Sequence, residues 1–134
     1  MHQKYYFDTS IWIDLYHKRG NNGELAKQLV RKIILEEGII VYSDFTIIEL
    51  KRLKFSKKEI DNILGIARNN LERVHVYEEQ IKEARRLARE RDVPHKDALY
   101  AVLARDNQLQ LISNDDHFNK LKDITKTKKP EGLI

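Results

Sequence analysis

Four carboxylates stand in the sequence where the neighbouring residues predict burial or the start of a helix: Asp8, Glu49, Asp97 and Asp115. Asp8 is the clearest case, because it separates the apolar stretches YYF and IWI. Aspartate is rarely buried without a partner. A carboxylate in such a position therefore predicts either a local structural role or a functional site.

Convergence of these carboxylates would indicate a metal site. Like charges held close together raise one another's pKa, so the cluster gains stability only from a counter-cation. The chain has no cysteine and no paired-histidine motif, and hard oxygen ligands favour Mg²⁺ or Mn²⁺. Such an ion can generate a nucleophilic hydroxide and stabilise in-line displacement at phosphorus. The chemistry indicated is metal-dependent hydrolysis of a phosphodiester.

Each carboxylate taken alone also has a structural interpretation. Asp8 fits the N-cap of the helix that follows it. Asp97 and Asp115 would both complement a helix dipole, and Glu49 would pair with a neighbouring basic residue on a solvated face. The motif around Glu49 is the least distinctive, and a shift in the helix boundaries would bring other acids into its place: Glu36, Glu37 and Asp44.

Short apolar runs alternate with longer amphipathic ones along the whole chain. The pattern predicts strands at 4–8, 39–43, 73–77 and 109–113, with a weak edge strand at 123–127. It predicts helices at 9–19, 22–38, 44–55, 78–92 and 96–107, a helix opening at Ser56 and a short one at 115–121. Ser43 is an expected N-cap, and the SKKE sequence that begins at Ser56 has the form of a capping box.

This alternation places the chain in the α/β class, with a mainly parallel sheet covered on both faces. Right-handed crossovers bring the carboxyl ends of parallel strands to one edge, where the functional sites of such folds lie. Asp8 and Asp115 follow strands at that edge, and Asp97 lies in the first turn of a helix. We therefore expect Asp8 to share a metal ion with Asp97 and Asp115.

The composition is that of one soluble globular domain of 134 residues, with a net charge of +4. No apolar run approaches the ~20 residues of a membrane span, the N-terminus lacks the pattern of a signal peptide, and the absence of cysteine fits a cytoplasmic location. Basic runs at 51–58, 85–92 and 126–130 are individually typical of solvated surfaces. Together they favour a polyanionic partner such as nucleic acid. Residues 126–134 are expected to form a basic tail.

Four motifs in order give the chain a resemblance to a known family: FDTSIWI, TIIEL, HKDALYAVLA and LISNDDHF. The chain resembles a PIN-domain nuclease, most of all the small VapC-type toxin ribonucleases, over essentially its whole length. The resemblance implies an α/β/α sandwich and a divalent-metal-dependent endoribonuclease that leaves a 5′-phosphate and a 3′-hydroxyl. It also implies a small antitoxin partner and a homodimer.

The resemblance assigns roles to individual residues. It makes Asp8, Glu49, Asp97 and Asp115 the acidic metal-binding set. Ser113 would orient a carboxylate or a water molecule, and the polar residues after the first aspartate would hydrogen-bond within the site: Thr9 and Ser10. His117 stands where many family members carry a further acid. The resemblance assigns no role to it or to three other nearby side chains: His95, Tyr100 and Asp116.

Two other functions compete with nuclease activity. The first is a non-catalytic RNA-binding PIN-like module, which retention of all four acids disfavours, because RNA binding requires Lys and Arg. The second is an aspartyl phosphotransferase of the haloacid-dehalogenase type. That chemistry requires a second aspartate two residues after the first, and Ser10 occupies this position.

Overall fold

The computed structural model describes residues 3–18 and 20–134. Its centre is a five-stranded sheet in the order β3-β2-β1-β4-β5, and every neighbouring pair is parallel. The strands are short and run along the chain as β1 (Lys4–Phe7), β2 (Ile39–Ser43), β3 (Leu71–Val74), β4 (Gln110–Ile112) and β5 (Thr127–Lys128). The mainly parallel sheet expected from the sequence is confirmed.

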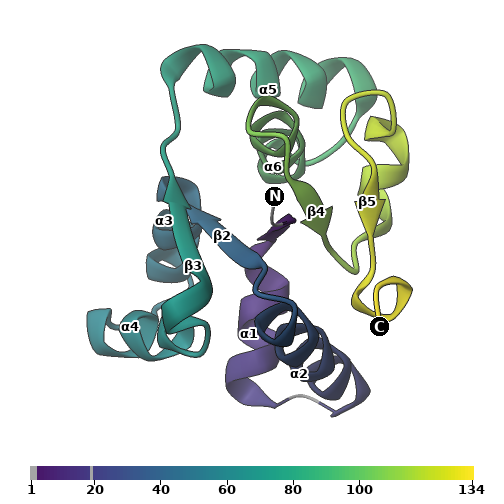
Figure 1. The fold of residues 1–134 in the computed structure, drawn as a ribbon. Coiled ribbons are helices and arrows are strands. Elements are labelled where there is room, and N and C mark those ends of the chain that lie inside the picture. The colour runs from purple at the N-terminus through teal and green to yellow at the C-terminus, as the bar shows by residue number, and fades with distance from the viewer. Residues whose placement is uncertain (1–2, 19) are drawn as a thin grey trace.

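Helices cover both faces of the sheet, as Figure 1 shows. One face carries α5 (Glu78–Arg91) and α6 (His95–Asp106), and the other carries α1 (Thr9–His17), α2 (Gly20–Leu35) and α4 (Lys57–Gly65). The helix α3 (Asp44–Arg52) follows β2, and short 3₁₀ turns complete the fold: η1 (Arg68–Asn70), η2 (Asp116–Leu121) and η3 (Pro130–Gly132). The molecule is thus a three-layer α/β/α sandwich. Among the described residues, no helix is long and apolar enough to cross a membrane.

Alternation along the strands divides the core into two clusters. Tyr6 and Leu111 are fully buried against α5 and α6, whereas Phe7 and Ile112 are fully buried against α1 and α2. Successive side chains of a strand point to opposite faces, so a strand covered on both sides is apolar along its length. The central strands are therefore held rigidly at the point where β1 and β4 end.

Several predicted elements differ from those of the structure. The third strand ends at Val74 and not at residue 77, because the amide of Val76 donates to the Asp44 carboxylate (3.1 Å) instead of to β2. The last strand is Thr127–Lys128, since the amides of Ile124 and Thr125 turn back to a carbonyl in η2. The short helix predicted at 115–121 is instead the 3₁₀ turn η2, with Asp115 as its N-cap. The first helix ends at His17, and the final residue of its predicted span, 19, lies outside the described residues.

The predicted caps and the C-terminal segment have defined structure. Ser43 and Ser56 each cap a helix through a capping box, as the sequence predicts. Within the segment 126–134, two residues form β5 and Pro130 is buried. The Lys32 ammonium donates to the carbonyl of Leu133 at 2.5 Å, which ties the end of this segment to α2.

Candidate active site

All four predicted carboxylates line one pocket at the carboxyl edge of the sheet. Asp8 follows β1, Asp115 follows β4, Glu49 comes from α3 and Asp97 from the first turn of α6. We call this the acidic pocket; its lining consists of Asp8, Thr9, Ser10, Glu49, Lys96, Asp97, Tyr100 and Asp115. The convergence expected from the topology is therefore present.

Several hydrogen bonds hold the carboxylate of Asp8 in place. It is the N-cap of α1, where its Oδ1 accepts from the Ile11 amide (3.2 Å) and the Ser10 hydroxyl (2.6 Å). Its Oδ2 accepts from Ser113. Burial raises the pKa of Asp8, the nearby charge of Glu49 raises it further, and these hydrogen bonds oppose the shift. Asp8 thus caps a helix and also places a carboxylate in the pocket.

Glu49 is oriented by two hydroxyl groups. Its Oε1 accepts from Thr9 at 2.5 Å and from Tyr100 at 2.8 Å, and the two hydroxyl groups also contact each other. On the same helix, Thr46 is fully buried and belongs to the capping box of Ser43. The helix α3 is therefore anchored so that Glu49 reaches the pocket. The alternative acids lie elsewhere: Glu36 and Glu37 are exposed after α2, and Asp44 pairs with Arg73.

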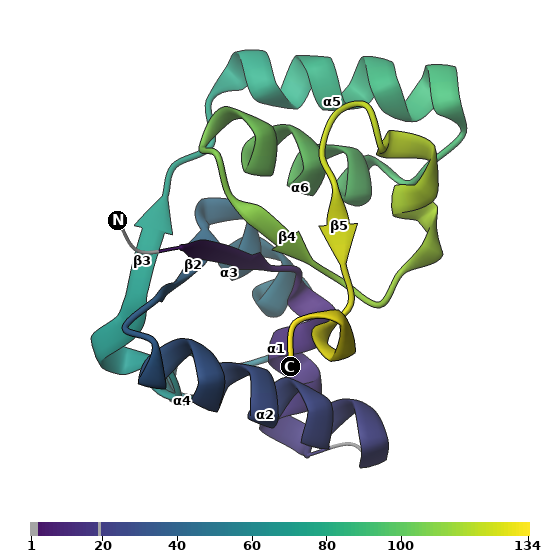
Figure 2. The ribbon, with the colours of Figure 1, turned by 45° about the vertical axis from the view of Figure 1, so that its right-hand side comes forward.

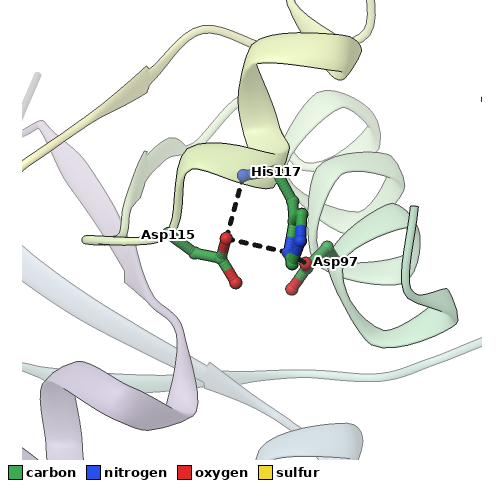
Figure 3. Close-up of side chains that lie close together, drawn as sticks. All are labelled: Asp97, Asp115 and His117. Carbon is green, nitrogen blue, oxygen red and sulfur yellow. Dashed lines mark hydrogen bonds and ion pairs between the residues drawn. The ribbon is translucent and has the colours of Figure 1, made fainter. Parts of the chain in front are cut away.

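Asp97 and Asp115 form the second half of the pocket together with His117. The Nδ1 atom of His117 lies 3.1 Å from Asp97 Oδ2 and 2.9 Å from Asp115 Oδ1, so the imidazole stands between the two carboxylates (Figure 3). Burial, and then the charge of Asp115, raises the pKa of Asp97 to about 6, although contact with His117 opposes the shift. This pair therefore carries an electrostatic cost near neutral pH.

Ser113 connects the two halves. Its hydroxyl donates to Asp8 Oδ2 and accepts from the Asp115 amide at 3.0 Å. The side chain is only 2% exposed and lies just beyond β4. One hydroxyl group therefore fixes the relative positions of the carboxylates that follow β1 and β4.

The described residues contain one compact set of three metal-ligating side chains. Asp97, Asp115 and His117 each offer an atom within 4.8 Å of the others. Asp8 lines the same pocket but does not belong to this set, so the structure pairs Asp97 with Asp115 more closely than it pairs either with Asp8. The donors are carboxylate oxygens and one imidazole nitrogen, with no thiol, which suits a hard or borderline divalent ion.

Sequence reasoning missed three residues of this region. Tyr100 received no role, yet its hydroxyl group reaches Glu49. The available signal was its i,i+3 spacing from Asp97, which places both residues on one face of α6. His117 received no role, and its contact with Asp97 spans two distant parts of the chain. Lys96 lines the pocket as its cation. Asp116, by contrast, points to Lys129 at 3.8 Å in the adjoining pocket.

Comparison with known proteins agrees with this geometry. The family model described as PIN domain matches residues 5–124. A comparison with curated proteins found no match.

Solved structures share the fold at low sequence identity. VapBC2 from Rickettsia felis, solved bound to a DNA fragment from its promoter, has a TM-score of 0.70 and 19% identity, covering 94% of this chain and 98% of that one. A toxin-antitoxin complex from Klebsiella pneumoniae gives a TM-score of 0.56 with 24% identity, covering 85% and 89%. FitAcB from Neisseria gonorrhoeae gives 0.61 with 18% identity, covering 96% and 99%.

Proposed function

This chain belongs to the PIN-domain family, and on that premise we propose that it is a divalent-metal-dependent endoribonuclease. The observation that carries the proposal is the acidic pocket, in which four carboxylates from four separate elements meet. Burial, and then the charges of neighbouring carboxylates, raise the pKa of Asp8 and Asp97, so keeping both groups ionised costs stability. A bound cation would offset this cost, which gives the cluster a functional reason to exist.

The donor set fits a divalent ion. Asp97, Asp115 and His117 would hold it directly, and Asp8 and Glu49 would face it across the same pocket. When bound, Mg²⁺ or Mn²⁺ supplies Lewis-acid activation of water and neutralises charge on the reacting phosphate. Carboxylates favour either ion, and the imidazole favours the softer Mn²⁺.

Neighbouring residues orient the carboxylates and would attract the substrate. Thr9 and Tyr100 hydrogen-bond one carboxylate oxygen of Glu49, and no hydrogen bond to the other oxygen is formed among the described residues. Lys96 is exposed at the rim, and its ammonium would attract a phosphate toward the acids. A second pocket shares Thr9, Ser10, Glu49 and Lys96 with the first and extends to Arg52. These cations favour a nucleic-acid backbone as the substrate.

The biological role we propose is that of the toxin in a toxin-antitoxin pair. Its support is the likeness of the fold to VapBC2 from Rickettsia felis and to a structure described as a toxin-antitoxin complex. The proposal includes a small antitoxin protein as partner, a homodimer and a cytoplasmic location. Co-expression with the product of a neighbouring short reading frame, followed by co-purification and a growth assay, tests this role.

Nuclease activity is tested by incubating labelled structured RNA with the purified protein and Mn²⁺ or Mg²⁺. Cleavage is expected from the wild type and from the exposed double variant Glu36→Gln/Glu37→Gln, which removes the same charge outside the pocket. It should disappear in Asp8→Asn/Asp97→Asn and after chelation of the metal. Cleavage that survives in the pocket variant would refute the assignment. Salt-sensitive RNA binding without turnover in the wild type would instead identify a non-catalytic RNA-binding module.

A further inference from the structure

A basic pocket adjoins the acidic one on the β5 side. It lies between η2 and β5 and is lined by cationic and polar side chains that include Asn119, Lys122, Lys128 and Lys129. We call it the lysine pocket. Asp115 lines both pockets, so the two adjoin each other. The proposed function assigns nothing to these lysines.

The backbone fixes the lysine pocket relative to the carboxylates. Lys128 pairs in register with Ile112 of β4, and Ile112 pairs with Phe7 of β1, next to Asp8. The Ser113 amide donates to the Lys128 carbonyl (3.0 Å), and the Asp8 amide donates to the Ile112 carbonyl (3.1 Å). Two strand spacings separate β1 from β5, about 10 Å. Figure 2 shows β5 beside β4, with η2 and the connecting loop at its flank.

The lysines exceed the acids available to pair with them. Lys129 lies 3.8 Å from Asp116, a long separation between exposed groups. Lys122 and Lys128 are exposed, and neither makes an ion pair or a side-chain hydrogen bond within the part of the chain that the structure describes. Exposed lysines are common, but these converge on one concave surface beside a pocket of carboxylates. Such convergence favours a polyanionic ligand.

We propose that the lysine pocket binds a backbone phosphate of the RNA strand, adjacent to the phosphate that lies over the acidic pocket. This deepens the proposed function and rests on it. A polynucleotide carries phosphates at regular intervals, so one strand can occupy both pockets at once. An acidic protein segment would also satisfy the lysines, and the experiment below distinguishes it from RNA.

Binding is measured separately from cleavage to test this inference. The probe is a short fluorescent oligoribonucleotide in EDTA, followed by anisotropy across a salt series. We expect Lys122→Gln/Lys128→Gln to bind several-fold more weakly and to lower the slope of log K against log salt by about 0.7 for each phosphate that the variant no longer neutralises. The control Lys27→Gln/Arg31→Gln removes equal charge from α2, where both side chains are exposed and lie outside both pockets and outside the basic runs of the sequence, and should leave the slope unchanged.

A second arm locates the phosphate. Neutral methylphosphonate linkages are placed one at a time along the oligonucleotide. The wild type should lose affinity at one position near the cleavage site, and the lysine variant should be insensitive at that position. If the wild type binds and cleaves RNA but the lysine and control variants behave alike, this inference fails while the proposed function stands. If the wild type neither binds nor cleaves, the proposed function fails. Loss of affinity for an acidic peptide but not for RNA would assign the surface to a protein partner and overturn the inference.

Discussion

Replacement of Asp97 by asparagine should stabilise the metal-free protein while removing activity. Asp97 is 2% exposed, and its pKa is raised from 3.8 to about 6. One pKa unit corresponds to 1.36 kcal/mol, so keeping this carboxylate ionised in the folded protein costs about 3 kcal/mol above pH 6. Asparagine has nearly the shape of the neutral acid and does not carry this cost.

The effect has a defined dependence on pH. Between pH 4 and pH 6 the folded protein binds a proton at Asp97 that the unfolded chain does not, so wild-type stability falls as pH rises through this window. Asp97→Asn has no such loss. We therefore expect the variant to be more stable than the wild type by about 3 kcal/mol at pH 7.5 and equal to it near pH 4. At about 4 °C per kcal/mol, a chain of this size gains roughly 10 °C in Tm.

Urea unfolding in EDTA at the two pH values measures this difference. The matched control is Asp61→Asn, since Asp61 is exposed on α4 and makes no ion pair within the described part of the chain; its stability should follow the wild type. Mn²⁺ at a hundred times its Kd should raise the unfolding free energy of the wild type by about 2.7 kcal/mol but not that of Asp97→Asn, and so remove the stability advantage of Asp97→Asn. A variant less stable than the wild type at pH 7.5, or an advantage that persists at pH 4, would refute the reasoning.

Two further substitutions probe the hydroxyl groups of the site. Tyr100→Phe removes one of the donors to Glu49 and a contact to Thr9. The unfolding free energy should fall by about 1 kcal/mol, whereas the single-turnover cleavage rate should fall roughly tenfold or more. An unchanged rate would contradict the orienting role of Tyr100. Ser113→Ala leaves Asp8 without one donor and the Asp115 amide without its acceptor. We expect the free energy of unfolding in urea to fall by about 1–3 kcal/mol. The pH profile of cleavage should move to higher pH because the pKa of Asp8 rises, and a profile that coincides with that of the wild type would contradict the role of Ser113.

Local pattern and topology were enough to predict much of the fold and to bring Asp8, Asp97 and Asp115 together, whereas Glu49 was assigned to the site from the family resemblance. Asp8 was recognisable because its neighbours are apolar, and the rule that parallel strands end at one edge placed it with Asp115. Ser43 and Ser56 were predictable as caps because a cap depends on residues three positions apart. These features are encoded within a few residues or follow from the connectivity alone.

The errors arose where distant side chains decide the structure. The third strand stopped early because Asp44, more than thirty positions away, binds the amide of Val76. The role of His117 depends on its contact with Asp97, twenty residues upstream. Tyr100 looks like a core residue and is one, since it is 1% exposed, but its hydroxyl group emerges at the pocket. No local pattern contains such contacts.

The order of the strands also determines when the acidic pocket comes into existence during synthesis. Asp8 leaves the ribosome before Asp115, which follows roughly 5 to 20 s later at ordinary elongation rates. Since β1 lies between β2 and β4, it lacks one neighbouring strand during this interval. A nascent chain that ends before β4 holds Asp8 and Glu49 but lacks Ser113 and Asp115, and the edge of β1 remains open to other strands. Unfinished chains therefore carry an incomplete set of carboxylates, and the full set forms only when the part of the protein from β4 onward docks.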